Sequence, residues 1–130
     1  MILGIKTLDN VQIRNKSVLV RIDINSDIKN NKLVSSERLT APLETLRELQ
    51  SKKAKVVLLA HQGRPSSLDF ISLEQHAKCL KKFIKLKFMP EIISDKAINM
   101  IKKMKAGEII LLENVRFLQE ELNYKFDKPN

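Results

Sequence analysis

The sequence predicts an α/β fold in which helices flank a parallel sheet, making three layers. Three short apolar runs carry this prediction, because a buried parallel strand reads as a continuous apolar stretch. These runs are Ser17–Asp23, Lys55–Ala60 and Ile109–Leu112. Segments with helical periodicity separate them, and such alternation is typical of parallel sheets with right-handed crossovers. A chain of 130 residues is long enough for one domain with a single core.

The first apolar run is followed by a polar turn at Lys29–Lys32 and then by a helical pattern. Four leucines recur there at spacings of four and three residues, which places them on one helix face. They are Leu39, Leu43, Leu46 and Leu49. Pro42 falls inside this pattern. A proline either begins a helix in its first turn or kinks it, and the sequence leaves both interpretations open.

A second helix is expected to begin near Ser72, after the second apolar run. Ser72 and Gln75 have the spacing of a capping box, in which each side chain binds the other residue's backbone N–H. The apolar positions that follow lie on one face of this helix: Ala77, Leu80, Phe83 and Ile84. Beyond it, Lys87–Met89 is predicted to be a short strand that Pro90 ends.

A third helix is expected to begin after Ser94, which is a suitable N-cap, and Gly107 is its predicted stop signal. Its apolar positions are Ala97, Ile98, Ile101 and Met104. The complete order is therefore strand, helix, strand, helix, strand, helix, strand. This order indicates a Rossmann-like architecture. The tail, Gln119–Asn130, is polar and reads as a linker or as the start of a longer segment.

The composition favours a globular protein over a disordered, membrane-spanning or disulfide-bonded one. Apolar residues make up 43% of the chain and charged residues 30%, which is ordinary for a packed domain. No apolar run approaches the ~20 residues that cross a bilayer, and Met1–Lys6 lacks the pattern of a signal peptide. The single cysteine, Cys79, excludes an internal disulfide and a cysteine-based metal site. We therefore expect a cytoplasmic protein that does not bind membranes.

The net charge of +9 raises the question of nucleic-acid binding. Most of the excess is lysine scattered over the helical segments, and aromatic residues make up only 5% of the chain. Proteins that bind single strands usually place aromatic side chains among the basic ones, so that bases stack on them. The pattern therefore favours a solvated lysine surface, and RNA or DNA binding is the alternative.

The candidate functional residues lie in small polar clusters that end the three apolar runs. The clusters comprise Asp23, Ile24 and Asn25 after the first run, His61, Gln62, Gly63 and Arg64 after the second, and Glu113, Asn114 and Arg116 after the third. Ligands of open α/β sheets bind beyond the carboxyl ends of the strands, so the clusters should share one site. Two arginines and a histidine indicate that the ligand is an anion.

Arg64 belongs to a Gly-Arg-Pro turn, in which Gly63 lets the backbone approach a ligand closely. Together with His61 it can hold a phosphate through charge-assisted hydrogen bonds worth roughly 1.5–3 kcal/mol each. These residues also have structural interpretations. Arg64 can be an exposed turn residue, Arg116 can pair with a nearby acid, and the Asp-x-Asn after the first run can cap a turn.

Arg38 stands near the start of the first helix, where the helix dipole disfavours a cation, and this hints at a ligand there. We assign His76 and Cys79 structural roles. No histidines, cysteines or carboxylates have the spacing of metal ligands, so no metal site is predicted. The three glycines form neither a P-loop nor a G-x-G-x-x-G turn. The chain therefore offers no recognisable site for nucleotide phosphates.

Taken together, the three clusters resemble those of the phosphoglycerate kinase family. Val18–Asn25 (VLVRIDIN) resembles the family's first strand and its Asp-x-Asn, and Lys53–Pro65 (KAKVVLLAHQGRP) resembles the second strand and its His-x-Gly-Arg-Pro turn. Gly107–Phe117 (GEIILLENVRF) is similar to the third landmark, Glu-Asn-x-Arg. The resemblance runs from about Lys6 to Glu121. The pair His61-Gln62, together with Ile24, resembles the archaeal members of the family.

The resemblance implies that residues 1–130 are an incomplete N-terminal domain of a two-domain kinase, the domain that binds 3-phosphoglycerate. The implied reaction is reversible phosphoryl transfer between 1,3-bisphosphoglycerate and ADP, which gives 3-phosphoglycerate and ATP in glycolysis and gluconeogenesis. ATP or ADP with Mg²⁺ would bind a C-terminal domain outside this chain. We therefore expect the chain alone to be inactive, with an uncovered sheet edge where the rest of the domain would pack.

The resemblance also assigns residue roles. Arg38 would be the catalytic residue, facing the carboxyl end that carries the transferred phosphoryl group. The implied substrate-binding residues are Asp23, Ile24, Asn25, Arg38, His61, Gln62, Gly63, Arg64 and Arg116. Among them the Asp-x-Asn pair would contact the glycerate, and the histidine and the last two arginines would hold the distant phosphate. The alternatives are a non-catalytic anion-binding module and a basic nucleic-acid-binding protein.

Overall fold

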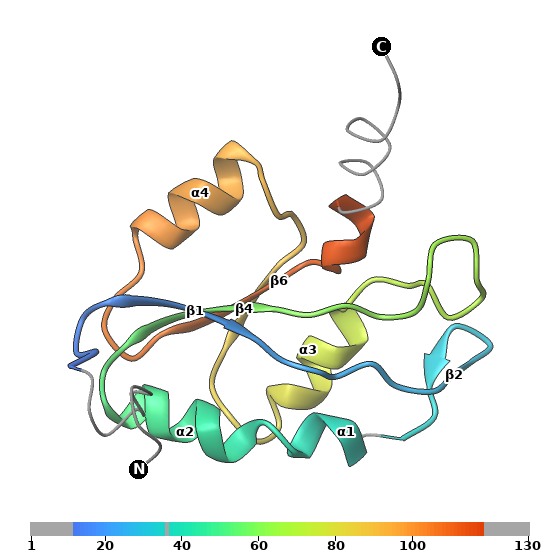
Figure 1. Ribbon diagram of the computed structural model, residues 1–130, viewed down its shortest axis with the longest axis horizontal. Helices are drawn as coiled ribbons and strands as arrows, with labels where there is room; N and C mark the ends of the chain where they lie inside the picture. The colour runs from blue at the N-terminus through green and yellow to red at the C-terminus, as the bar shows by residue number, and fades with distance from the viewer. Residues whose placement is uncertain (1–11, 36, 119–130) are drawn as a thin grey trace, which may run out of the picture.

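Four parallel strands form the central sheet of the computed structural model, in the order β1-β4-β6-β5 (Figure 1). They are β1 (Ser17–Arg21), β4 (Lys55–Leu59), β5 (Lys87–Met89) and β6 (Ile109–Leu112). The structure describes residues 12–35 and 37–118, so the expectations for residues 1–6 and 119–130 lie outside it. All four strands were predicted from the sequence, and the predicted parallel α/β fold is confirmed.

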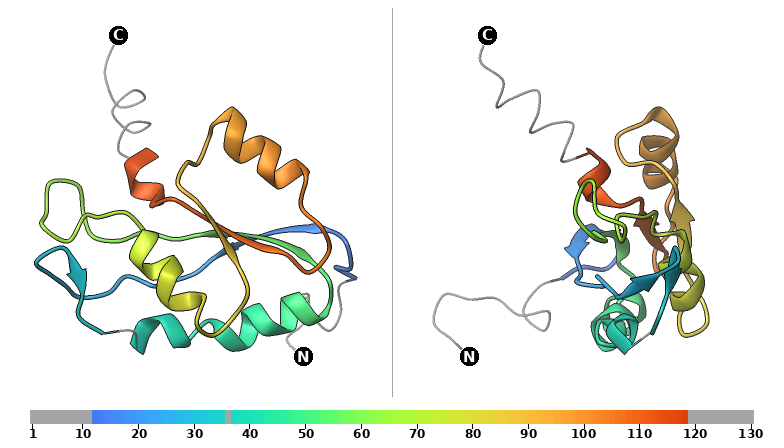
Figure 2. Two further views of the ribbon diagram at one scale, coloured as in Figure 1. Left: turned by 180° about the vertical axis from the view of Figure 1, so that it is seen from behind. Right: turned by 90° about the vertical axis from the view of Figure 1, so that its right-hand side faces the viewer.

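The helices cover the two faces of the sheet unequally. Helices α1 (Glu37–Thr40), α2 (Leu43–Ser51) and α3 (Glu74–Leu80) lie on one face, and α4 (Asp95–Lys102) lies on the other (Figures 1 and 2). The chain crosses β6 to reach β5 and then returns, so a right-handed crossover must place α4 opposite the other helices. The result is the expected three-layer arrangement.

Two apolar cores form because side chains alternate along each strand. Val56 and Leu58 of β4 belong to the larger core, beneath α1, α2 and α3, while Val57 belongs to the smaller core beneath α4. Every residue of β6 is buried, which is why that segment reads as an uninterrupted apolar run. The edge strand β1 differs. Its Leu19 shares the face of Val57 but is 67% exposed.

Pro42 separates two helices where the sequence suggested one. Helix α1 ends at Thr40 and α2 begins at Leu43, directly after the proline. Pro42 is the N-cap of α2, and its carbonyl accepts a hydrogen bond from the N–H of Leu46 at 3.0 Å. The proline therefore begins the second helix, which agrees with the first of the two interpretations left open by the sequence. All four leucines of the predicted face are buried in the larger core, so the periodicity was informative although the helix is broken.

A two-stranded hairpin, β2 (Ile28–Lys29) and β3 (Lys32–Leu33), occupies the predicted polar turn. Asn30 and Asn31 form the turn with φ of 53° and 61°, the left-handed conformation that two-residue hairpin loops require. The side chain of Gln75 supports this hairpin, because its Oε1 accepts a hydrogen bond from the N–H of Leu33 at 3.0 Å. Strands this short have no readable periodicity, so the sequence predicted only the turn.

The predicted capping box at α3 is wrong. The amide of Gln75 is engaged by the hairpin, and the N-cap position is occupied by Leu73, which has no capping side chain. Ser72 contributes in part, since its Oγ accepts a hydrogen bond from the N–H of Glu74 at 3.1 Å. A buried carboxylate replaces the missing partner: Glu113, from beyond β6, accepts the N–H of Leu73 at 2.8 Å.

The prediction for α4 is confirmed at its start and corrected at its end. Ser94 Oγ accepts a hydrogen bond from the N–H of Ala97 at 3.1 Å, as an N-cap should. The helix ends at Lys102, several residues before the predicted stop at Gly107. Gly107 instead shapes the turn into β6, where its N–H donates to the carbonyl of Ala54 at 2.8 Å. No helix among the described residues is long and apolar enough to span a membrane.

Candidate functional site

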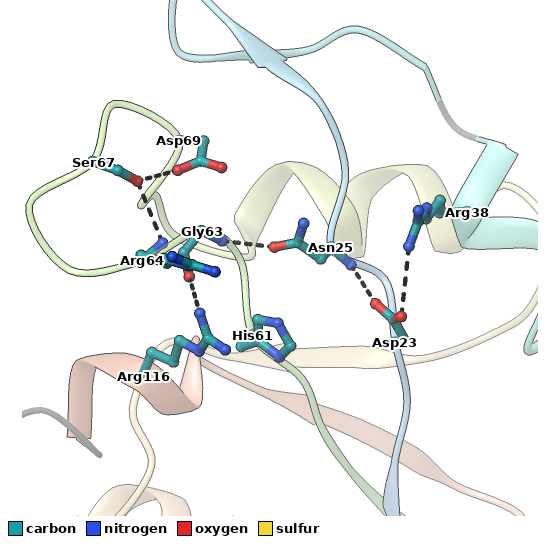
Figure 3. Close-up of a pocket in the computed structure, with 9 residues that line it drawn as sticks. All are labelled: Asp23, Asn25, Arg38, His61, Gly63, Arg64, Ser67, Asp69 and Arg116. Carbon is teal, nitrogen blue, oxygen red and sulfur yellow. Dashed lines mark hydrogen bonds and ion pairs between the residues drawn. The ribbon is translucent and has the colours of Figure 1, made fainter.

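The polar clusters after β1, β4 and β6 converge on one pocket at the carboxyl edge of the sheet (Figure 3). Its volume is about 450 Å³. The lining residues are Asp23, Asn25, Arg38, His61, Gly63, Arg64, Ser67, Asp69 and Arg116. Parallel strands present their carboxyl ends on the same edge, so clusters far apart in the sequence meet there. Seven of the nine predicted site residues line this pocket.

The Gly63 turn lies at the centre of the site. Its N–H donates to Asn25 Oδ1 at 2.7 Å, and its carbonyl accepts a hydrogen bond from the Arg116 guanidinium at 2.7 Å. Gly63 has φ of +69°, and a Cβ added to it would lie 2.5 Å from the backbone of Asp69. Only glycine fits this position, because both the backbone conformation and the neighbouring loop exclude a side chain.

Arg116 is held at the start of a helical turn that follows β6, at residues 115–118. The N–H of Arg116 donates to Asn114 Oδ1 at 3.1 Å, which fixes the backbone there. One guanidinium nitrogen binds the carbonyl of Gly63, as Figure 3 shows. A guanidinium carries five N–H donors in a planar fork, so the others can bind an anion in the pocket.

Arg64 differs from Arg116 in being exposed. Its backbone N–H donates to Ser67 Oγ at 3.3 Å, while its guanidinium pairs with no acid among residues 12–35 and 37–118. Ser67 in turn donates to Asp69, so this loop is held together by its own side chains. Ser67 and Asp69 were not predicted. Their only signal is a polar loop directly after the Gly-Arg-Pro turn.

Arg38 reaches the opposite side of the pocket from α1, where it forms an ion pair with Asp23. The distance from Nη1 to Oδ2 is 3.5 Å, and the two side chains are 64% and 68% exposed. An exposed pair of this kind contributes well under about 1 kcal/mol, so the arginine is readily available to a ligand. Asp23 also accepts a hydrogen bond from the N–H of Asn25 at 3.2 Å, which is the turn-capping role foreseen from the sequence.

His61 lies partly buried between the strand ends. The pKa of His61 lies below its usual value, first because of burial and then because Arg116 and Arg21 repel a proton, with Asp23 opposing them. Its Nδ1 is buried and has no partner among the described residues. The imidazole is therefore neutral near pH 7. An anion in the pocket would favour its protonated form.

Ile24 and Gln62 do not line the pocket, although both were predicted to bind substrate. Both side chains are completely buried. Ile24 packs into the larger core. Gln62 makes hydrogen bonds to the backbone of Ser26, not to the pocket. Neither side chain has access to a ligand. Both residues belong to polar segments at the strand ends, but their side chains point into the protein interior.

Asn114 and Glu113 are buried beneath the site and stabilise its segments through hydrogen bonds. Asn114 Nδ2 donates to the carbonyls of Gln62 at 2.8 Å and Ile71 at 3.0 Å, which joins the segments after β4 and before α3. Glu113 accepts hydrogen bonds from Ser72 Oγ at 2.6 Å and from backbone N–H groups. No cluster of three histidine, cysteine, aspartate or glutamate residues in the described part of the chain could hold a metal ion.

Comparisons with known proteins agree with the resemblance. The family model described as phosphoglycerate kinase matches residues 8–129. The phosphoglycerate kinase of Saccharolobus solfataricus is 44% identical over 123 residues, covering 92% of this chain and 30% of the relative. That of Archaeoglobus fulgidus is 45% identical over 123 residues, covering 93% of this chain and 30% of the relative.

A solved structure gives the same result. The crystal structure of phosphoglycerate kinase from Pyrococcus horikoshii OT3 matches with a TM-score of 0.81 and 38% identity, over 85% of this chain and 28% of that chain. The chain thus spans about 30% of the length of the curated relatives that it matches. The match to the family model covers most of the sequence, and this chain belongs to the phosphoglycerate kinase family.

Proposed function

We propose that residues 1–130 are the 3-phosphoglycerate-binding portion of a phosphoglycerate kinase. The whole enzyme would transfer a phosphoryl group reversibly between 1,3-bisphosphoglycerate and ADP, in the cytoplasm, as a step of glycolysis and gluconeogenesis. The convergence of Arg38, Arg64, Arg116 and His61 on one pocket carries the proposal. Such a pocket suits a small ligand with an anionic group at each end.

The two ends of the pocket suggest different roles. His61, Arg64 and Arg116 would hold the phosphate that is not transferred, because two arginine forks can bind several of its oxygens at once. Arg38 would face the carboxyl end and neutralise charge on the transferred phosphoryl group. The ion pair between Arg38 and Asp23 supports this assignment, since it holds Arg38 at the pocket through a weak, exchangeable contact.

Asn25 and Asp23 would contact the glycerate. Asn25 Oδ1 is occupied by the N–H of Gly63, so its Nδ2 would serve as the donor to a substrate oxygen. Phosphoryl transfer requires little covalent chemistry from a protein, and positioning and charge neutralisation supply most of the catalysis. The described residues are suited to those two tasks.

ATP or ADP and Mg²⁺ would be supplied to the complete enzyme by a second domain. The residues of this chain do not fit either group, since there is no glycine-rich phosphate loop in the sequence and no metal-ligand cluster in the described part. On this proposal the isolated chain binds substrate without turning it over.

Calorimetric titration with 3-phosphoglycerate tests the proposal. The isolated chain should bind weakly, and Arg64→Ala should lower the affinity by about tenfold or more, because a charge-assisted hydrogen bond is lost. Lys102→Ala is the matched control, since Lys102 is an exposed cation at the end of α4. Equal binding by Arg64→Ala and the parent chain would remove Arg64 from the site. Formation of ATP from ADP and 1,3-bisphosphoglycerate by this chain alone would contradict the proposed division between domains.

A further inference from the structure

A buried side-chain amide joins the two segments that carry Asn25 and Gly63. Gln62 Oε1 accepts a hydrogen bond from the N–H of Ser26 at 2.8 Å, and Gln62 Nε2 donates to the carbonyl of Ser26 at 2.9 Å. Both residues are buried. This reciprocal pair determines which way the amide faces, because an N–H must meet the oxygen and a carbonyl must meet the nitrogen.

His76 of α3 makes a third contact to the same amide. Its Nε2 lies 2.8 Å from Gln62 Oε1, and the imidazole is completely buried. An amide oxygen only accepts, so His76 must donate through Nε2–H and leave Nδ1 bare. Nδ1 has no partner among the described residues, and burial lowers the pKa of His76 to about 4. The neutral tautomer that donates to Gln62 is therefore the stable form near pH 7.

The backbone next to this side chain is bonded to residues of the pocket. The peptide unit between Gln62 and Gly63 is held at both polar atoms, since its carbonyl accepts from Asn114 Nδ2 at 2.8 Å and its N–H donates to Asn25 Oδ1 at 2.7 Å. Ser26, which Gln62 binds, is the next residue after Asn25. Gln62 is thus bonded to the neighbour of Asn25 through its side chain and to Gly63 through the chain itself. Its buried side chain fixes the two residues relative to each other without contacting a ligand.

We propose that Gln62 and His76 are a buried positioning pair that sets the geometry of Asn25 and the Gly63-Arg64 turn for binding the phosphate. The nature of the ligand rests on the proposed function, while the positioning role rests on the contacts alone. Without the amide, Ser26 and His76 would keep buried polar groups that lack partners, and the two segments would separate to hydrate them. Displacements of about 1 Å can lower the rate of a reaction by about a hundredfold, so small movements of these segments are enough to disturb a site.

The experiment compares Gln62→Leu with Gln50→Leu in the full chain. Gln50 is a matched control, because its amide also binds two backbone groups, the carbonyls of Lys85 at 3.2 Å and Gly107 at 3.1 Å, on the amino side of the sheet. Each variant is titrated with 3-phosphoglycerate by calorimetry, and amide hydrogen exchange of Gly63 and Ser26 is followed by NMR without ligand.

Gln62→Leu should lower the affinity for 3-phosphoglycerate and the protection of the Gly63 N–H by about tenfold or more each. Gln50→Leu should change both by less than about twofold. His76→Leu should act like Gln62→Leu, and His76→Gln, which retains an N–H donor, should recover most of the loss. If Gln62→Leu does not fold, the two His76 variants decide the question with the same measurements.

Two results would overturn the positioning role: equal effects of Gln62→Leu and Gln50→Leu on affinity, or unchanged exchange of the Gly63 N–H in Gln62→Leu. A parent chain that fails to bind 3-phosphoglycerate would instead count against the proposed function. In that case the exchange rates of Gly63 and Ser26 still decide the positioning role, because they are measured without ligand.

Discussion

Replacing Gly63 with alanine tests whether the turn at the centre of the pocket depends on the absence of a side chain. The φ of Gly63 is +69°, and an added Cβ would lie 2.5 Å from the carbonyl carbon and oxygen of Asp69. A residue other than glycine costs roughly 1–2 kcal/mol in this backbone conformation. Forcing apart packed atoms adds about 1–3 kcal/mol. Gly63→Ala should therefore lower the free energy of unfolding by about 2–5 kcal/mol.

Gly107→Ala separates the two contributions. Gly107 also has a positive φ, +87°, but the nearest atom to an added Cβ is Lys53 Cδ at 3.7 Å, an ordinary contact. Only the backbone cost of about 1–2 kcal/mol should appear in this variant. The effect of alanine on the unfolded chain is the same in both variants and cancels in the comparison. The difference of about 1–3 kcal/mol then measures the crowding against Asp69.

Urea unfolding followed by circular dichroism measures both free energies, and calorimetry with 3-phosphoglycerate measures the effect on binding. Gly63→Ala should weaken binding, because the displaced Asp69 loop carries Arg64, and Gly107→Ala should leave binding unchanged. Equal destabilisation by the two variants would refute the steric reasoning. A Gly63→Ala variant with normal affinity would refute the link between this turn and the pocket.

Three further predictions concern protons and salt. The pKa of His76 falls from 6.5 in the unfolded chain to about 4 in the folded protein. Between these pH values the unfolded state binds more protons than the folded state. The free energy of unfolding therefore decreases as the pH falls from 6.5 to 4. Urea unfolding should show a loss of up to about 3 kcal/mol, and His76→Gln should flatten this dependence. Burial and Arg116 lower the pKa of His61, whereas an anion bound beside it would raise this pKa. Sulfate should therefore bind more tightly below pH 7, and His61→Asn should remove this pH dependence. A pH-independent affinity of the parent chain for sulfate would contradict the prediction. Finally, random oligonucleotides should bind weakly without a steep salt dependence, since a steep slope in a salt titration would indicate that many phosphates are neutralised and would favour the nucleic-acid alternative.

The elements of the fold were predictable where their signal is local. The strands β4 and β6 read as apolar runs because both of their faces are buried, and the leucines of α1 and α2 read as one helix face. The hairpin of β2 and β3 was not predictable, because two-residue strands have no period. The capping box failed for a related reason: the amide of Gln75 binds backbone groups of the hairpin more than 40 residues away.

The site was predictable in its chemistry and only partly in its membership. Arginine, histidine and asparagine at three strand ends were sufficient to predict one shared pocket lined by these residues, since parallel strands end on one edge. The loop residues Ser67 and Asp69 were missed, because their position depends on how the segment after Arg64 folds back over Gly63. Gln62 was assigned to the ligand because it adjoins His61 and Gly63, yet its side chain faces the interior.

By itself, the sequence determined the strands and the residue types at their ends, because each of these depends on neighbours along the chain. The tertiary structure alone decided which of those residues face the pocket and which hold it together. Gln62 meets Ser26 across 36 positions and Arg116 meets Gly63 across 53. Such hydrogen bonds exist only after the strands have paired, and no local pattern of residues encodes them.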